Sequence, residues 1–201
     1  MNHLSNDMAK RSSIKEAAKE LFFRFGLSKT SMDDIARQCN LAKPTLYYYY
    51  PSKESIFNEI VIDEARGFID RVEKKIPGQM PADEKIAFFL NTLYHDLKKY
   101  SKELAHLPEL LYESYPHGKP IVEKINELFS EKLRPILIEG KKQKILEISD
   151  IDSTLSALVI MTNFLNLDWM RRVGENHRNI MIERVIEILL NGIRRKKSYV
   201  K

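Results

Sequence analysis

LAKPTLYYYYPSKES (residues 41–55) places four consecutive tyrosines between two prolines. The first proline, Pro44, follows Lys43 and suits the first turn of a helix, where its missing N–H costs little. The second, Pro51, stops the helix, and Ser52 is a good N-cap for another helix after it. The segment therefore predicts a short helix whose exposed side is rich in aromatic hydroxyl groups.

The four tyrosines cannot share one face of that helix, because each residue turns the chain by about 100°. Leu46 and Tyr50 are one helical turn apart and are predicted to face the core. Tyr47, Tyr48 and Tyr49 then sweep across the exposed side. A tyrosine combines a flat apolar ring with a hydroxyl that can reach a phosphate oxygen or a base edge. This side is a candidate nucleic-acid surface, with packing of the rings at a helix end as the alternative.

Two further helices are predicted ahead of this segment. From Ser12 to Phe25, apolar residues recur with helical spacing, and Gly26 supplies the left-handed residue that ends the helix. Ser31 is the predicted N-cap of the next helix, and Asn40 is expected to adopt a positive φ in the turn after it. Three helices, the last two joined by a tight turn, predict a helix-turn-helix unit.

The rest of the chain predicts helices nearly throughout and no strand. Pro135 is expected to bend or locally break its helix, and Asp152 is the predicted cap of the helix that follows. We expect an all-α protein with a helix-turn-helix DNA-binding domain at 1–57 and a larger helical ligand-binding and dimerisation domain at 58–201. The helices expected after Pro51 run over about residues 52–75, 82–100, 121–137, 152–173 and 179–195.

The composition is typical of a globular helical protein rather than a disordered or secreted one. Hydrophobic residues make up 43% and charged residues 30% of the chain, with only 7 Gly. The single cysteine, Cys39, excludes an intramolecular disulfide. The first residues lack the apolar stretch of a signal peptide, and the apolar run at 155–170 is interrupted by polar residues. We therefore expect a cytoplasmic protein without a membrane partner.

Charge and motifs favour binding over catalysis. The net charge is +5, and residues 1–57 hold nine Lys/Arg against six Asp/Glu, which permits a polyanionic partner. His95, His106, His117 and His177 match no metal-ligand spacing, and the chain has no glycine-rich phosphate loop or GxSxG turn. We expect no catalytic residues, no metal and no cofactor.

Residues 11–60 resemble the DNA-binding domain of the TetR (tetracycline repressor) family of bacterial transcriptional regulators. The matching pieces are AAKELFFRFGLSKTSMDDIA and LAKPTLYYYYPSKESIF, with a weaker match at ILIEGKKQKILEISDID. The chain departs from the family at Cys39 and Asn40, where Ala-Gly is common, and at Ala42, where a serine is common. The resemblance implies an all-helical homodimer with an N-terminal DNA-reading domain and a C-terminal domain that dimerises and often holds an inducer.

The resemblance also implies roles for residues around the tyrosine run. Lys43 and Tyr48 resemble residues that face DNA bases, and Lys53 is expected to lie over the DNA backbone. The residues that resemble phosphate contacts are Thr45, Tyr47, Tyr49 and Lys53, with Ser31 assisting. The predicted DNA-binding set is Ser31, Lys43, Pro44, Thr45, Tyr47, Tyr48, Tyr49 and Lys53.

The second part of the chain is expected to hold a small-molecule inducer and to form the dimer. The last two helices contain LSALVIMTNFLNL and IMIERVIEILLNGI, whose wide apolar faces predict a homodimer through a four-helix interface. A pocket between helices needs apolar walls and a few polar groups, although core packing is the alternative for most such side chains. The candidate ligand-binding residues are Phe89, Tyr94, His95, Tyr112, Met161, Phe164 and Trp169.

These features predict a dimeric transcriptional regulator that binds double-stranded DNA. We expect a near-palindromic operator, repression rather than activation, and release by a small-molecule inducer. Two other classes stay open. One is a helical ligand- or partner-binding module that does not recognise DNA, and the other is a helical enzyme that uses the C-terminal cavity.

Overall fold

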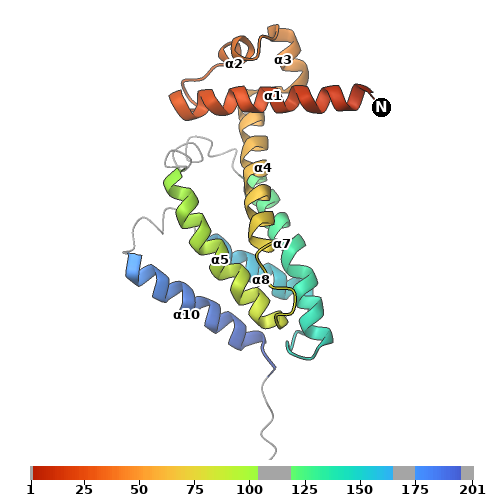
Figure 1. Cartoon of the computed structure of the whole chain (residues 1–201), viewed down its shortest axis with the longest axis vertical. Coiled ribbons are helices and arrows are strands. Elements are labelled where there is room, and N and C mark those ends of the chain that lie inside the picture. The colour runs from red at the N-terminus through yellow and green to blue at the C-terminus, as the bar shows by residue number, and fades with distance from the viewer. Residues whose placement is uncertain (1, 104–118, 165–174, 196–201) are drawn as a thin grey trace, which may run out of the picture. The chain divides into compact units, whose positions relative to one another are not determined.

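The computed structural model describes residues 2–103, 119–164 and 175–195 (Figure 1). All the named elements in these ranges are α-helices. The expected all-α fold is confirmed. Leu146 and Arg194 form an isolated bridge, but the described ranges contain no β-strand. The helices are α1 (Asn2–Phe25), α2 (Met32–Gln38), α3 (Lys43–Tyr49), α4 (Lys53–Glu73), α5 (Ala82–Glu103), α7 (Lys119–Lys142), α8 (Ile151–Phe164) and α10 (Glu175–Ile193).

The chain divides into two compact units, and the divisions fall inside helices α4 and α7. The first unit contains α1, α2, α3, the part of α4 up to Arg66 and the start of α7 up to Ile125. The second contains the rest of α4 from Gly67, all but the start of α7, and α5, α8 and α10. The expected division of function between residues 57 and 58 stays a prediction.

The core of the first unit forms where α1, α2, α3 and the first turns of α4 meet (Figure 1). Phe22 of α1 and Phe57 of α4 pack edge to face, with ring centroids 5.9 Å apart. Leu46 and Tyr50 are both buried, as their spacing of one helical turn predicted. The buried residues of this core are Ile14, Ala18, Phe22, Leu27, Met32, Ile35, Ala36, Leu46, Tyr50, Ile56, Phe57, Ile60, Val61 and Ile121.

Helix α1 begins about three turns earlier than the apolar pattern predicted, at Asn2 instead of Ser12. It ends as expected before Gly26, which has a φ of +86° and donates its N–H to the Phe22 carbonyl at 2.9 Å. The additional turns carry Asp7, which contacts α3.

In the second unit, α5 packs along α10 (Figure 1). Lys85 of α5 binds Glu139 of α7 at 2.8 Å, and Arg194 binds Asp83 in the first turn of α5 at 2.7 Å. These ion pairs join α5 to the end of α7 and to the residue after α10. Among the described side chains of α5 and α10, the buried ones are Ala82, Ile86, Phe89, Leu90, Leu93, Tyr94, Ile182, Ile186 and Leu190.

One local prediction about the second unit was wrong, and another was wrong only in part. Helix α7 continues through Pro135 without a break, and the expected bend at this residue stays a prediction. Helix α8 begins at Ile151 and is capped by Asp150 instead of Asp152, because the Asp150 carboxylate accepts the Ser153 N–H at 2.7 Å. Hydrogen bonds from Ser153 lower the pKa of Asp150, as expected for a capping carboxylate.

None of the described helices is long and apolar enough to cross a membrane. Helix α8 ends at Phe164, and the remainder of the helix predicted over 152–173 lies outside the described residues.

Candidate nucleic-acid interface

The N-terminus of α2 is closed by a capping box. The Ser31 hydroxyl accepts the Asp34 N–H at 3.2 Å, and the Asp34 carboxylate accepts the Ser31 N–H at 3.0 Å. These hydrogen bonds with Ser31, together with the nearby Arg37, lower the pKa of Asp34. The predicted N-cap is confirmed. The Ser31 hydroxyl already makes hydrogen bonds with Asp34, and its assisting role at phosphate stays a prediction.

The turn between α2 and α3 is tight and has the expected left-handed residue. Asn40 has a φ of +52°, which asparagine tolerates better than most residues. The Leu41 N–H reaches back to the Ala36 carbonyl at 2.9 Å. Helix α3 then starts at an N-cap, Ala42, that makes no side-chain capping bond. The two helices therefore form the predicted helix-turn-helix.

The outer side of α3 is aromatic and exposed. Tyr48 is 79% exposed and Tyr47 is 44% exposed, whereas Leu46 and Tyr50 are buried. The rings of Tyr48 and Tyr49 meet edge to face, with centroids 5.2 Å apart. The helical angle thus separates the tyrosines as predicted, with at least two rings free to meet a partner.

The first turn of α3 adds a positive charge to this side. The Lys43 ammonium lies 2.7 Å from the Asp33 carboxylate of α2, and both groups are exposed. Hydrogen bonding to Asp33 and its negative charge raise the pKa of Lys43, so this side chain is protonated at neutral pH. Pro44 and Thr45 are exposed beside it. The first turn therefore offers an ammonium group and a hydroxyl group to a polyanion.

Tyr49 is only half-buried, but its hydroxyl points back into the protein. It donates to the Asp7 carboxylate of α1 at 3.1 Å. Burial and this hydrogen bond raise the pKa of Tyr49. The contact joins α3 to the additional turns of α1, and a phosphate contact by Tyr49 stays a prediction.

Lys53, the first residue of α4, also points into the protein. Its ammonium donates to the carbonyls of Leu27, Thr30 and Ser28 at 2.7, 2.9 and 3.2 Å. All three acceptors lie in the loop between α1 and α2. This geometry does not test the predicted phosphate contact by Lys53. In the unbound protein, the N–H groups of its ammonium are hydrogen-bonded to these carbonyls.

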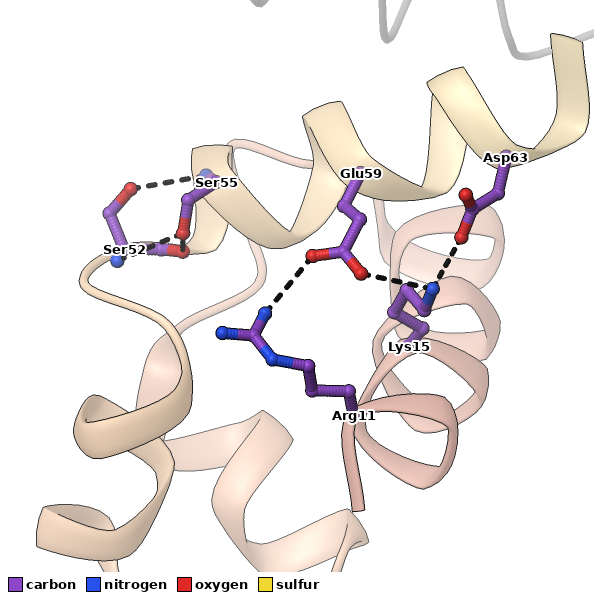
Figure 2. A network of polar contacts seen from close by, with 6 residues as sticks. All are labelled: Arg11, Lys15, Ser52, Ser55, Glu59 and Asp63. Carbon is purple, nitrogen blue, oxygen red and sulfur yellow. Dashed lines mark hydrogen bonds and ion pairs between the residues drawn. The ribbon is translucent and has the colours of Figure 1, made fainter. Parts of the chain in front are cut away.

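The start of α4 is capped as predicted, by a reciprocal pair of serines (Figure 2). The Ser52 hydroxyl accepts the Ser55 N–H at 3.2 Å, and the Ser55 hydroxyl donates to the Ser52 carbonyl at 2.6 Å. This cap sets the direction in which α4 leaves α3.

Figure 2 shows a charge network that joins α1 to α4. Arg11 lies 3.2 Å from one oxygen of Glu59, and Lys15 lies 3.1 Å from the other. Lys15 also pairs with Asp63, one turn further along α4. Single exposed ion pairs contribute about 0–1 kcal/mol, but a network with shared partners restrains the angle between two helices more strongly. The network therefore fixes α4 to the helix that supports α3.

Arg11 also covers the buried ring of Tyr50. Its guanidinium lies 4.8 Å from the ring centroid. Burial and the adjacent Glu59 carboxylate raise the pKa of Tyr50 to about 12. The last tyrosine of the run is thus a core residue that anchors the end of α3.

Sequence reasoning missed the residues that hold this surface in place. Asp33 precedes Lys43 by ten positions, and no local helical pattern connects them. Asp7 precedes Tyr49 by 42 positions, and no local pattern connects them. Glu59 follows Arg11 by 48 positions, which is again beyond any local pattern.

The predicted ligand-binding residues are only partly described. Phe89 and Tyr94 are buried in the second unit, and Phe89 packs edge to face on Phe129 at 6.3 Å between centroids. The Tyr94 hydroxyl is buried without a hydrogen-bond partner among the described residues. His95 is exposed, with its ring centroid 5.3 Å from that of Tyr94. The other predicted residues, whose side chains lie outside the described part of the chain, are Tyr112, Met161, Phe164 and Trp169.

A metal-dependent site is not visible in the part of the chain that the structure describes, where no group of three His, Cys, Asp or Glu residues could hold a metal ion. The surface of α3 is instead built for contact, with aromatic rings, a hydroxyl and an ammonium group on a short helix.

Comparison with known proteins agrees with this arrangement. Residues 14–60 match the family described as "Bacterial regulatory proteins, tetR family". The fatty acid metabolism regulator protein of Bacillus subtilis is 26% identical over 187 residues, which cover 91% of this chain and 95% of that protein. The regulator QacR of Staphylococcus aureus is 25% identical, over 90% of this chain and 96% of QacR.

Solved structures share the fold over nearly the whole chain. Thermus thermophilus FadR, a TetR-family repressor solved with lauroyl-CoA, has a TM-score of 0.67 and 20% identity, covering 95% of this chain and 98% of FadR. The helix-turn-helix geometry, the family match and the relatives agree. Residues 14–60 therefore belong to the tetR family of bacterial regulatory proteins, and the chain is a DNA-binding transcriptional regulator rather than an enzyme.

Proposed function

We propose that this regulator represses transcription by binding a near-palindromic operator as a homodimer, and that a small molecule releases it. Residues 1–57 read the DNA, and residues 58–201 hold the ligand and form the dimer. Two α3 helices, one from each subunit, enter successive major grooves about 34 Å apart.

The observation that carries this proposal is the outer side of α3. Tyr47 and Tyr48 are exposed on the second helix of the helix-turn-helix, beside the ammonium of Lys43 and the hydroxyl of Thr45. Exposed tyrosine rings gain little from contact with water. On DNA, the ring can pack against a thymine methyl group and the hydroxyl can form a hydrogen bond with a base edge. Lys43 and Tyr48 face the bases, and Thr45 and Tyr47 contact the phosphates.

Apolar side chains on the last helices support the homodimer. Ile180 and Ile188, two turns apart on α10, are each 63% exposed, and Ile160 of α8 is also exposed. Large exposed aliphatic side chains along one helix indicate an interaction surface. A second copy of the chain provides the self-complementary partner that a two-fold axis requires.

The ligand proposal rests on the buried residues of α5 and on the relatives. The Tyr94 hydroxyl is a buried polar group without a described partner, among apolar neighbours such as Phe89. Relatives of the same fold are solved with stearoyl-CoA, lauroyl-CoA and resorcinol, so the fold accepts both long acyl thioesters and small phenols. The ligand favours a dimer conformation whose α3 spacing no longer fits the operator.

A selection from random oligonucleotides tests the DNA-binding part. We expect the wild-type protein to enrich duplexes with two inverted half-sites. Tyr48→Ala should change the preferred bases and weaken the selected duplex by about 1–3 kcal/mol. The control is Phe25→Ala, which removes an exposed aromatic ring from the end of α1, away from α3. If no duplex is enriched, or both variants select the same duplex as the wild type, the assignment of α3 is wrong.

Thermal shifts and operator release test the ligand part. Long-chain acyl-CoA thioesters, free fatty acids and small phenols are added to the protein and then to its complex with the selected duplex. We expect one class to raise the melting temperature and to release the DNA. A panel in which no compound stabilises the protein would count against an inducer of these classes.

A further inference from the structure

Asp33 of α2 is an acidic residue beside the exposed side of α3. Its carboxylate lies 2.7 Å from the Lys43 ammonium, and the Asp33 and Lys43 side chains are 55% and 56% exposed. A negative charge at this place repels the phosphates of any duplex that α3 meets. Asp33 therefore lowers the affinity for DNA in general, and its contribution has to be sought elsewhere.

The dipole of α2 does not account for Asp33. An acid in the first turn stabilises the N-terminus of a helix, but Asp34 already does so, because its carboxylate accepts the Ser31 N–H at 3.0 Å. The Asp33 carboxylate contacts the next helix instead. Helix α3 has no acid in its own first turn and no side-chain cap, and it begins with the cation Lys43. Asp33 thus supplies from α2 the anion that the start of α3 lacks.

The contact also restricts where the Lys43 ammonium can point. Lysine carries its charge on a flexible four-carbon stem, and an ammonium without a partner is drawn to the nearest phosphate of a duplex. Asp33 holds this charge beside the exposed side of α3 and occupies one of its three donors. The two remaining donors match O6 and N7 of guanine, the acceptors that a lysine contacts in the major groove.

We propose that Asp33 is a positioning residue, which directs the Lys43 ammonium to a guanine of the operator and keeps it from the phosphates. The proposal rests on the DNA-binding function proposed above, in which Lys43 faces the bases. Asp33 weakens binding to every duplex through its charge, but it raises the discrimination against duplexes that lack guanine at one position. Interfaces commonly gain specificity from a repulsive group of this kind.

Asp33→Ala separates the positioning role from a purely structural one. We expect tighter binding to a duplex of random sequence, with a slope of log affinity against log salt that is steeper by about 0.9 per subunit, because Lys43 gains a phosphate. The preference for guanine at one position should fall about fivefold or more. A purely structural role predicts the opposite, namely weaker binding to all duplexes and a lower melting temperature, and that result would overturn the proposal.

Lys43→Met identifies the base pair that Lys43 contacts. Each base pair of the selected half-site is replaced in turn, and the affinities of the wild type and the variants are compared. We expect Lys43→Met and Asp33→Ala to relax the preference at the same G·C pair, and the double variant to be as selective as Lys43→Met alone. Wild-type preference at that pair in Asp33→Ala would overturn the proposal. Relaxation at a different pair would also overturn it, since Asp33 would then read a base itself.

Glu16→Ala is the matched control for the change in charge. It removes one negative charge from an exposed position of α1 in the same compact unit. We expect it to leave the salt slope and the base preference at their wild-type values. Equal changes in Glu16→Ala and Asp33→Ala would show that net charge, and not the contact with Lys43, decides the result.

The ion pair can also be measured without DNA. Hydrogen bonding to Asp33 raises the pKa of Lys43, so an NMR titration of the Lys43 side chain should give a lower pKa in Asp33→Ala than in the wild type. An unchanged pKa would overturn the proposal. If the wild-type protein enriches no duplex, the proposed function fails and the positioning role fails with it. If a duplex is enriched and Asp33→Ala keeps the wild-type preference, only the positioning role fails.

Discussion

Tyr49 differs from Tyr47 and Tyr48 in the direction of its hydroxyl, which donates to Asp7 of α1 at 3.1 Å. Its ring supports the exposed ring of Tyr48 edge to face. The orientation of Tyr48 therefore depends on a carboxylate near the start of α1. The contact between Tyr49 and Asp7 therefore reduces the conformational freedom of the Tyr48 ring, which DNA binding would otherwise have to restrict.

Asp7→Ala should lower the pKa of Tyr49. Burial and the hydrogen bond to Asp7 raise that pKa, so the neutral phenol is the favoured form. The contact contributes stability below the ordinary tyrosine pKa and loses it as the pH rises through the raised value. An NMR titration of the Tyr49 ring carbons measures the change. Met8→Ala, at the exposed neighbouring position of α1, is the control. An unchanged Tyr49 pKa in Asp7→Ala would show that Asp7 is not its partner.

Helical geometry was enough to predict which tyrosines are buried, because the angle between successive residues is a property of the helix itself. It placed Tyr50 inside and Tyr47, Tyr48 and Tyr49 outside. The structure confirms Tyr50, Tyr47 and Tyr48, whereas Tyr49 is half-buried against the core. It could not predict the partners of Tyr49 and Lys53. Those partners are distant in sequence, and the carbonyls around Lys53 carry no signature of residue type.

At the scale of helices, the caps of the helix-turn-helix were predictable and the caps of the second unit were not. Ser31 was predicted correctly as the cap of α2, although Thr30 stands beside it, whereas Asp152 was predicted as the cap of α8 and Asp150 is the cap. Pattern alone does not decide between such neighbours. Helix α7 tolerates Pro135 because one lost hydrogen bond is offset by the buried Leu133 and Leu137 on either side of it.

Gly140→Ala should destabilise the second unit, although alanine is the better helix former. A Cβ at Gly140 of α7 would lie 2.7 Å from Cγ of the buried Leu146 and 3.0 Å from Cβ of Ala82. We expect a loss of about 1–3 kcal/mol in the free energy of unfolding, since overpacking outweighs the gain of about 1 kcal/mol in helix propensity. Denaturant unfolding followed by circular dichroism measures it.

Gly67→Ala is the matched control for this substitution. A Cβ at Gly67 of α4 would meet only the end of the Arg71 side chain, at an ordinary 3.5 Å. It should therefore stabilise the protein by up to about 1 kcal/mol. Equal effects of the two substitutions would show that helix propensity, and not the close approach of Leu146, decides the result at position 140.

At the scale of the whole molecule, the proposed function depends on two copies of the chain. One α3 helix presents a small contact surface, and a single half-site gives limited affinity. Joining two such surfaces makes the second contact intramolecular and raises the affinity by about 10²–10⁴-fold when the spacing fits. The apolar faces of the last two helices were readable from the sequence because their aliphatic residues are too numerous for one buried side. The ligand was not, because pocket walls and core residues have the same composition.

Replacing Ile180 and Ile188 together by glutamate should therefore produce a folded monomer with weak operator binding. Both side chains are exposed on α10, so the substitutions should cost little within one subunit, but two-fold symmetry would bring four negative charges into the interface. Analytical ultracentrifugation measures the association, and titration with the selected duplex should show a loss of about 10²-fold or more. Ile138→Glu, at a similarly exposed position of α7, should leave the dimer intact. A double variant that remains dimeric would place the interface elsewhere, and the spacing of the two α3 helices would then have to be set by another surface.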